Sequence, residues 1–185
     1  NRKNGIADQM VTRLKAHIPA PARELIRGFG VEAMARLLEG TTASTIPMAL
    51  FDPDDQLVYC SSGFAALYAV EDGPQTFASI MRRCHATGQG PLIETGDIDL
   101  WLESAHNRRR AVPHRRFEID FIDGRWFQAL ETTLDNGWVH LVLIDLTAFK
   151  AKEADLTIAR EAAEEEARTD ELTGVYSRRA IMRYL

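Results

Sequence analysis

Hydrophobic residues near the N-terminus recur with the spacing of an α-helix. In residues 5–18 they stand at i, i+4 and i+8, which predicts an amphipathic helix that Pro19 ends. Residues 22–39 have a second pattern of this kind, and we expect Gly28 and Gly30 to interrupt it. A short polar linker covers residues 40–45.

The pattern changes to short apolar runs after this linker. Two runs, at 46–51 and 56–60, flank the turn-forming sequence Asp52-Pro-Asp-Asp55 and predict a β-hairpin. Apolar residues at i, i+3 and i+4 then predict short helices around residues 64–68, 77–84 and 98–105, the last beginning near Asp97.

Three strands are predicted next. Phe117, Ile119 and Phe121 alternate with charged residues, a period of two that is typical of a strand. Turn sequences at 123–124 and 135–137 separate it from apolar segments at 126–133 and 138–144. Two strands, several small helices and a three-stranded meander together predict an α+β domain, with helices packed on one face of an antiparallel sheet.

A charged, alanine-rich segment without Gly or Pro runs from Thr147 to residue 173 and predicts a long helix. Phe149, Leu156 and Ala163 lie seven residues apart along it, which is the spacing of a weak coiled-coil seam. Two interpretations remain open: a single solvated helix, or a marginal parallel pair whose register a small input is able to change.

Composition narrows the class without naming a function. The 185 residues are 45% hydrophobic and 26% charged, with a net charge of -5, so nothing demands a nucleic-acid or membrane partner. No apolar run reaches the ~18 residues of a membrane helix. Cys60 and Cys84 are too few for a disulfide scaffold, and we expect reduced thiols in a cytoplasmic protein.

Several short motifs from residue 46 onward resemble those of PAS sensor domains. They are Ile-Pro-Met-Ala-Leu-Phe-Asp at 46–52, Gly-Phe-Ala-Ala-Leu-Tyr at 63–68, Asp-Gly-Arg-Trp-Phe at 123–127, Asp-Asn-Gly-Trp-Val at 135–139 and Asp-Leu-Thr at 145–147. The resemblance implies a PAS fold, which is a five-stranded antiparallel sheet with small helices on one face. We therefore expect an N-terminal helical extension (1–45), a PAS domain (46–146) and a signalling helix (147–169).

Residues 170–185 resemble the opening of the GGDEF diguanylate cyclase domain. The matching residues are Asp170, Leu172, Thr173, Gly174, Ser177, Arg178 and Arg179, with Ser177 in place of the usual Asn. Both residue types cap helices, so this difference is mild. The resemblance implies a parent enzyme that makes cyclic di-GMP from two GTP with Mg²⁺. Because the chain ends at Leu185, before the family's signature loop, we expect this polypeptide itself to be inactive.

The PAS resemblance also implies a pocket between the sheet and the small helices, for a small molecule. The candidate wall residues are Met48, Leu50, Val58, Phe64, Leu67, Phe77, Ile80, Met81, Phe117, Ile119 and Phe121. The alternative is that these residues only form core. His85 is a candidate axial ligand if the pocket holds haem, although a lone histidine is usually a surface or hydrogen-bonded residue.

Two further groups of polar residues are candidates for function. Arg108–Arg110 and Arg115–Arg116 form either a solvated basic loop and strand edge, which we favour, or an anion site. Asp145 and Thr147 lie between the last predicted strand and the long helix, and we expect one of them to cap that helix. With Phe149 and Leu156 they are the predicted signal-transfer residues.

Two functions fit this organisation. The first is a ligand sensor that regulates a diguanylate cyclase, and the second is a ligand-free dimerisation module that holds two cyclases together. Both predict a homodimer formed through the N-terminal helices and the linker helix. A third class, the input domain of a histidine kinase, would need a histidine-containing phosphoacceptor helix where Asp170-Glu-Leu-Thr-Gly stands.

Overall fold

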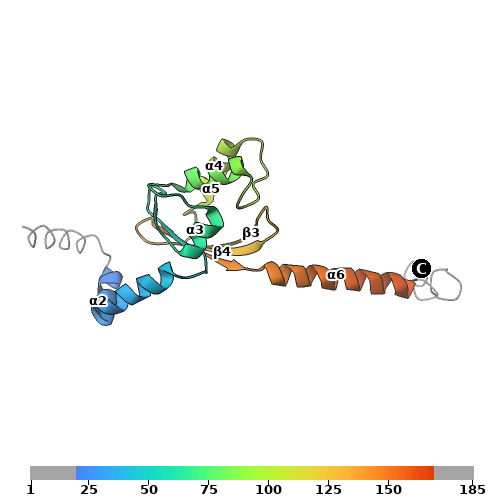
Figure 1. The fold of residues 1–185 in the computed structure, drawn as a ribbon, viewed down its shortest axis with the longest axis horizontal. Helices are drawn as coiled ribbons and strands as arrows, with labels where there is room; N and C mark the ends of the chain where they lie inside the picture. Colours follow the sequence, from blue (N-terminus) through green and yellow to red (C-terminus); the bar gives the residue numbers. More distant parts are fainter. Residues whose placement is uncertain (1–19, 169–185) are drawn as a thin grey trace, which may run out of the picture.

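The computed structural model describes residues 20–168, and five strands within them form one antiparallel sheet (Figure 1). The strands are β1 (Met48–Phe51), β2 (Leu57–Cys60), β3 (His114–Asp120), β4 (Trp126–Thr133) and β5 (Val139–Asp145). Their order across the sheet is β2-β1-β5-β4-β3. The C-terminal strand β5 therefore lies in the centre, beside the N-terminal strand β1.

Three short helices connect β2 to β3 and cover one face of the sheet (Figure 1). They are α3 (Ser62–Tyr68), α4 (Phe77–Thr87) and α5 (Ile98–Arg108). Each begins at a side chain that accepts hydrogen bonds from backbone N–H groups of the first turn: Ser61 for α3, Thr76 for α4 and Asp97 for α5. The apolar spacing and these caps explain why all three predicted helices form where they were expected.

The hydrophobic core lies between this helical layer and the sheet. Its largest fully buried side chains include Phe51, Phe64 and Ile80. Aromatic rings meet edge to face in the core, and Phe64 stacks on Tyr68 with ring centroids 4.4 Å apart. The inward positions of β4 and β5 alternate with half-buried ones, as expected for a sheet that packs on one face.

Two long helices extend from opposite sides of this body (Figure 1). Helix α2 (Ala20–Thr42) precedes the sheet and is kinked at Gly30, whose φ of 74° is left-handed, as the glycine pair predicted. Helix α6 (Thr147–Arg168) follows β5 directly. None of the helices in residues 20–168 is long and apolar enough to cross a membrane.

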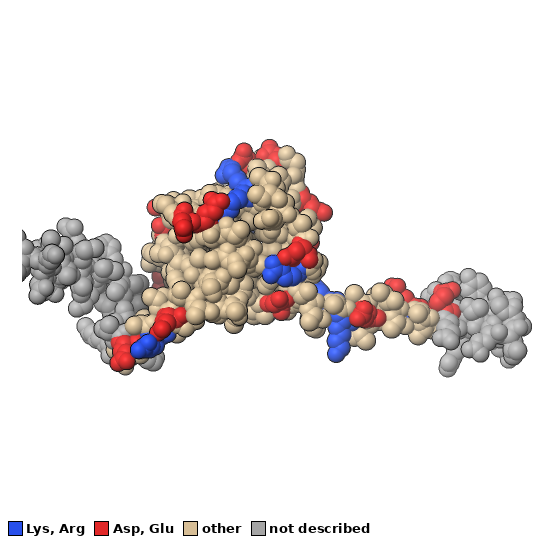
Figure 2. Space-filling model, viewed as in Figure 1, with Lys and Arg blue, Asp and Glu red and all other residues tan. Residues whose placement is uncertain are grey.

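The strand order and the helical layer make this a PAS fold, so the predicted α+β class is confirmed. The predicted helix at 5–18 and the cyclase-like residues Asp170 to Arg179 lie outside the described residues. Acidic and basic side chains are interspersed over the face shown in Figure 2, in keeping with a modest net charge of -5.

One part of the predicted wall was wrong. Ala49 and Phe51 are the buried residues of β1, so Met48 and Leu50 belong to the opposite, half-buried face of the sheet. Val58 of β2 is 53% exposed. In the sequence Met-Ala-Leu-Phe the residues of both faces are apolar, so alternation did not indicate which face points inward.

Candidate ligand cavity and its link to the C-terminal helix

A cavity of about 590 Å³ lies between the sheet and helices α3, α4 and α5. Five of the predicted wall residues line it: Phe64, Phe77, Met81, Phe117 and Ile119. Its other lining residues include Phe51, Tyr68, Ile93, Trp101, Ala105, Arg109, Arg115, Glu131 and Leu141. The volume falls in the range of small-molecule pockets, about 300–1,000 Å³.

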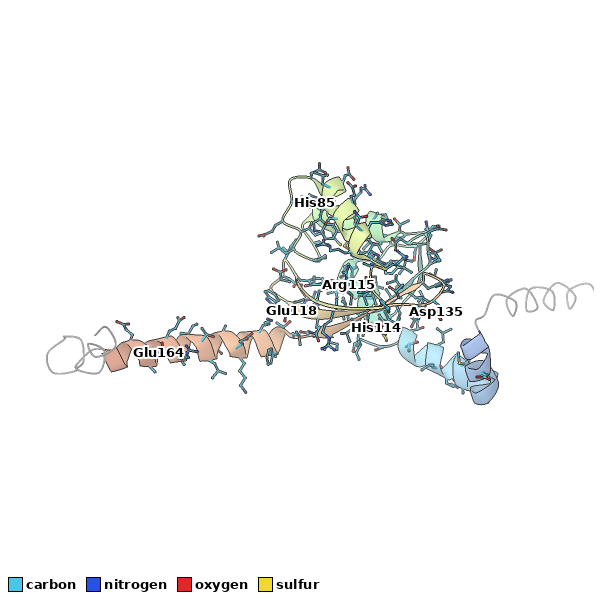
Figure 3. The ribbon with its side chains drawn as sticks, turned by 180° about the vertical axis from the view of Figure 1, so that it is seen from behind. His85, His114, Arg115, Glu118, Asp135 and Glu164 are labelled. Carbon is cyan, nitrogen blue, oxygen red and sulfur yellow. The ribbon has the colours of Figure 1, made fainter. Side chains whose placement is uncertain are left out.

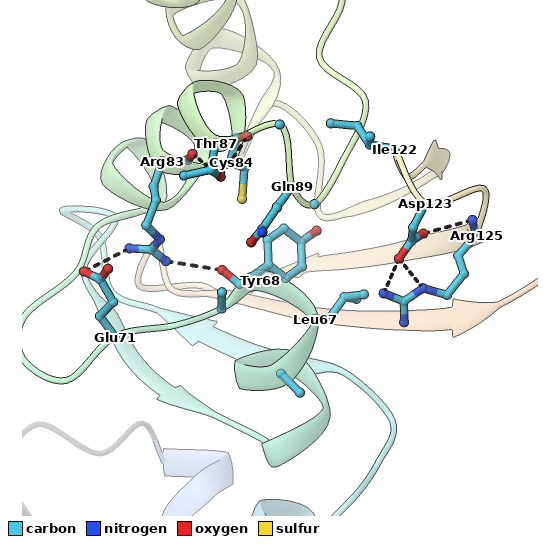
Figure 4. A pocket seen from close by; sticks show the side chains of 14 residues that line it. Leu67, Tyr68, Glu71, Arg83, Cys84, Thr87, Gln89, Ile122, Asp123 and Arg125 are labelled. Atoms are coloured by element: carbon cyan, nitrogen blue, oxygen red, sulfur yellow. Dashed lines mark hydrogen bonds and ion pairs between the residues drawn. The ribbon is translucent and has the colours of Figure 1, made fainter.

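The remaining predicted residues on the inner face have other positions. Ile80 and Phe121 are buried in the core without lining this cavity. Leu67 borders a second, more polar hollow of about 420 Å³ between α3, α4 and the β3–β4 turn (Figure 4). Tyr68 lines both hollows, so its ring forms part of the partition between them.

The second hollow has paired charges in its wall (Figure 4). Arg83 donates to the backbone oxygen of Tyr68 at 3.3 Å and lies 3.7 Å from Glu71. Across the hollow, Arg125 pairs with Asp123. Each guanidinium therefore already has a carboxylate partner, and the hollow offers no uncompensated charge to a ligand.

The main cavity, in contrast, ends at a buried ion-pair network. Arg109 is 5% exposed, and its guanidinium lies 3.1 Å from both Asp55 and Glu131. Arg110 donates to the same Asp55 oxygen at 2.8 Å. Arg115 of β3 stands directly across the strand pair from Glu131 of β4, at 3.6 Å.

These pairings set the charge state of the network. Burial by itself would raise the pKa of Asp55, but hydrogen bonds and positive charge from Arg110 and Arg109 outweigh it and hold that pKa below its ordinary 3.8. Burial lowers the pKa of Arg109, against the opposing effect of Asp55 and Glu131. An arginine remains protonated in proteins even so.

The prediction of a solvated loop and strand edge is correct for only part of the basic run. Arg108 and Arg116 are exposed, but Arg109 is buried and Arg110 is mostly buried. The residue that could have indicated a buried ion pair is Glu131. It occupies an inward position of β4, in phase with Phe127 and Ala129. A carboxylate on a buried strand face needs a cationic partner, and the basic run was available to supply it.

The structure gives no support to haem ligation by His85. This residue is on α4, in the helical layer, and its Nε2 lies 3.3 Å from the backbone oxygen of Thr95 (Figure 3). It does not line the main cavity. Within residues 20–168 no three His, Cys, Asp or Glu side chains are grouped in a way that would hold a metal ion.

The start of α6 is bonded to the sheet through Asp145 and Thr147. The Asp145 side chain accepts a hydrogen bond from the Thr147 N–H at 2.8 Å, and the Thr147 hydroxyl accepts one from the Trp126 N–H of β4 at 3.0 Å. The Leu146 N–H also donates to the Trp126 oxygen at 2.7 Å. These bonds fix the first turn of α6 to Trp126, the first residue of β4. Near the opposite end of the same strand, Glu131 lines the cavity.

The large apolar side chains of α6 are not buried against the PAS domain. Phe149 is 63% exposed and Leu156 is 64% exposed, which fits both the solvated-helix and the seam interpretation. Beyond the first turn, every side chain from 151 to 165 is exposed.

Comparison with known proteins adds little to this description. No family model matches the chain, and no curated protein matches it. The phage VqmA–DPO complex is similar with 13% identity and a TM-score of 0.42, over 69% of this chain and 59% of that one. The PAS domain of an HTR-like protein from Haloarcula marismortui is similar with 16% identity and a TM-score of 0.33, over 62% of this chain and 92% of that domain. Both likenesses are remote, and the fold class rests on the strand order itself.

Proposed function

We propose that this protein is the cytoplasmic sensory and dimerisation module of a diguanylate cyclase, in which the state of the cavity controls the pairing of α6. The observation that carries the proposal is the pair of hydrogen bonds between Trp126 and residues 146–147. They join the strand that forms part of the cavity wall to the helix that leaves the domain.

The route from cavity to helix is short and continuous. Glu131 contributes a buried carboxylate to the cavity wall, and β4 runs from there to Trp126 without interruption. A ligand that shifts Glu131 or its partner Arg109 would shift β4 along or across the sheet. Because Trp126 bonds both Leu146 and Thr147, that displacement would tilt or rotate the first turn of α6.

The exposed apolar residues of both long helices support a homodimer. On α6 these are Phe149 and Leu156, and on α2 they are Leu37 and Leu38, 61% and 57% exposed. Apolar side chains at helical spacing are normally covered in a functional protein. A second copy of the chain, aligned in parallel through these helices, would cover them in both subunits.

The proposed output rests on the likeness of residues 170–179 to the opening of a GGDEF domain. Condensation of two GTP requires two catalytic domains held face to face, and a parallel helix pair would set their distance and rotation. The residues that bind GTP and Mg²⁺ would lie in a part of the protein after residue 185. The ligand-free dimerisation module shares the helices but leaves the 590 Å³ cavity without a role.

Substitution of Thr147 tests the coupling in the full-length protein. Thr147→Val keeps the side-chain shape and removes the oxygen that accepts from Trp126, so cyclic di-GMP synthesis from GTP and Mg²⁺ should change several-fold while the fold stays intact. Asp145→Ala should act in the same direction. The measurements are product formation and thermal unfolding of each variant.

The matched control is Thr157→Val on the same helix. The Thr157 hydroxyl donates to the Glu153 backbone oxygen at 3.0 Å, within α6. This variant should keep wild-type activity. Equal activity of Thr147→Val and Thr157→Val would disprove the coupling. A full-length protein that makes no cyclic di-GMP under any condition would disprove the cyclase assignment.

A further inference from the structure

We infer that the ligand of the main cavity is a small, largely apolar or aromatic molecule that carries one carboxylate, and that Arg115 binds this group. The inference rests on the proposed sensory function and deepens it by naming the ligand class. It depends on the lining of the cavity, on the balance of charges at its end and on the contacts of Arg115.

The apolar part of the ligand follows from the aromatic lining. Six aromatic side chains border the cavity: Phe51, Phe64, Tyr68, Phe77, Trp101 and Phe117. They come from β1, β3 and all three short helices, so rings surround the space rather than forming one wall. Such a lining favours a ring or a short alkyl chain over a sugar or a polyol.

The charges at the end of the cavity do not balance. The ion-pair network holds three guanidiniums, of Arg109, Arg110 and Arg115, and two carboxylates, of Asp55 and Glu131. Of these, Arg109, Arg115 and Glu131 line the cavity itself. His106 also lies 3.6 Å from Asp55, but its side chain is 72% exposed. One negative charge is therefore missing from a network that is largely withdrawn from water.

Other charged residues near the rim do not supply this charge. Glu118 and Asp120 border the cavity, but β3 directs alternate side chains to opposite faces, and Phe117 and Ile119 occupy the inward positions. Glu118 pairs instead with Lys150 of α6 at 2.8 Å. Arg108 is exposed and adds a further positive charge at the rim.

Arg115 is the member of the network with unmet hydrogen-bonding capacity. Glu131 is bonded to Arg109 at 3.1 Å and lies 3.6 Å from the nearer Arg115 nitrogen, Nε. Arg115 Nη1 is buried and has no hydrogen-bond partner within residues 20–168. The Arg115 guanidinium lies over the Phe117 ring, 4.3 Å from its centroid, on the helical side of the sheet (Figure 3).

A carboxylate is the group that best satisfies this arrangement. Its two oxygens match the planar fork of a guanidinium, and its charge would bring the network to three positive and three negative groups. A neutral acceptor would provide the hydrogen bond but not the charge. The position of Arg115 beside Phe117 would place the apolar body of the ligand among the rings.

Calorimetric titration with matched probes tests this inference. Phenylacetate and hexanoate are the carboxylates, and phenylacetamide and hexanamide are their neutral counterparts. In the wild-type chain each carboxylate should bind about tenfold more tightly than its amide, which is the effect of one charge-assisted hydrogen bond. In Arg115→Gln this preference should disappear, and Arg115→Lys should restore part of it.

Arg116→Gln is the matched control, because it makes the same charge change on the exposed face of the same strand. It should keep the wild-type preference. Equal affinity for acids and amides in the wild type would overturn the carboxylate inference while leaving a ligand cavity in place. Failure of both acids to bind below about 1 mM would also overturn it.

These outcomes are separable from those of the proposed function. Binding of a carboxylate that leaves cyclic di-GMP synthesis unchanged would support the ligand class and contradict the coupling. Amide affinity and the unfolding temperature of Arg115→Gln show whether the cavity remains folded, so a lost preference is not confused with a lost structure.

Discussion

Helices α5 and α6 have similar amphipathic sequences but opposite environments. On α5, Leu102 and Ala105 are each 8% exposed and form part of the core under the helical layer. On α6, Phe149 and Leu156 are each more than 60% exposed. The difference shows that α5 packs into the core, whereas the apolar side chains of α6 are exposed in the single chain.

Their ion pairs differ in the same way. Arg109, the C-cap of α5, has a side chain only 3% exposed between Asp55 and Glu131. Lys150 of α6 is 26% exposed and bonds Glu118 at the edge of the sheet. Breaking a buried pair is strongly destabilising, and a surface pair contributes little to stability. The body therefore holds α5 rigidly and α6 by its first turn.

The largest expected effect is on the packing of α5. Leu102→Ala should lower the free energy of unfolding by about 2–5 kcal/mol, because it leaves a void in the core. Leu100→Ala on the same helix should change it by less than about 0.5 kcal/mol, since Leu100 is 63% exposed. Denaturant unfolding of both variants gives the values. Equal losses would mean that α5 is not a wall of the core.

A smaller effect, confined to acid pH, is expected from the ion pairs beside α5. The pKa of Asp55 is held below its ordinary value by Arg110 and Arg109, so its contribution to stability is complete above the unfolded pKa and is lost as pH falls through the folded one. Stability should therefore begin to fall as pH approaches the ordinary pKa of 3.8 and should continue to fall at lower pH.

Asp55→Asn isolates this contribution. The variant should be less stable at pH 7 and should lose less stability on acidification, as measured by denaturant midpoints across the same pH range. Asp54→Asn, at an exposed neighbouring carboxylate, should keep the wild-type pH profile. Parallel profiles for wild type and Asp55→Asn would show that another carboxylate is responsible.

The smallest effect on stability is expected on α6, where the change should instead appear in assembly. Leu156→Ser should alter the unfolding free energy by less than about 0.5 kcal/mol, because Leu156 is exposed in the single chain. It should nevertheless weaken the proposed dimer, measured by light scattering over a range of concentrations.

Ile158→Ser is the control for this substitution. Ile158 is 64% exposed, like Leu156, but lies outside the seven-residue spacing of Phe149, Leu156 and Ala163. It should leave assembly unchanged. A chain that is monomeric at all concentrations would contradict the seam on α6. Equal weakening of the dimer by Leu156→Ser and Ile158→Ser would contradict it as well.

Local sequence determined the elements of this protein. Apolar spacing, the caps at Ser61, Thr76 and Asp97 and the turn at 123–124 each act over a few residues, so strands and helices form where the pattern predicted them. The same holds for the kink at Gly30. The motif resemblance, rather than the periodicity, indicated how the strands would be arranged.

Tertiary structure decided the site. Arg109 meets Asp55 across 54 residues and Glu131 across 22, and only the paired strands and the end of α5 bring these three groups together. The inward face of β1 was predicted wrongly, because Met48 and Leu50 are as apolar as their buried neighbours. The sequence determines which side chains carry charge. Burial and charge pairing arise from contacts between distant segments, and these contacts place Arg109 and Arg115 in the wall of the cavity.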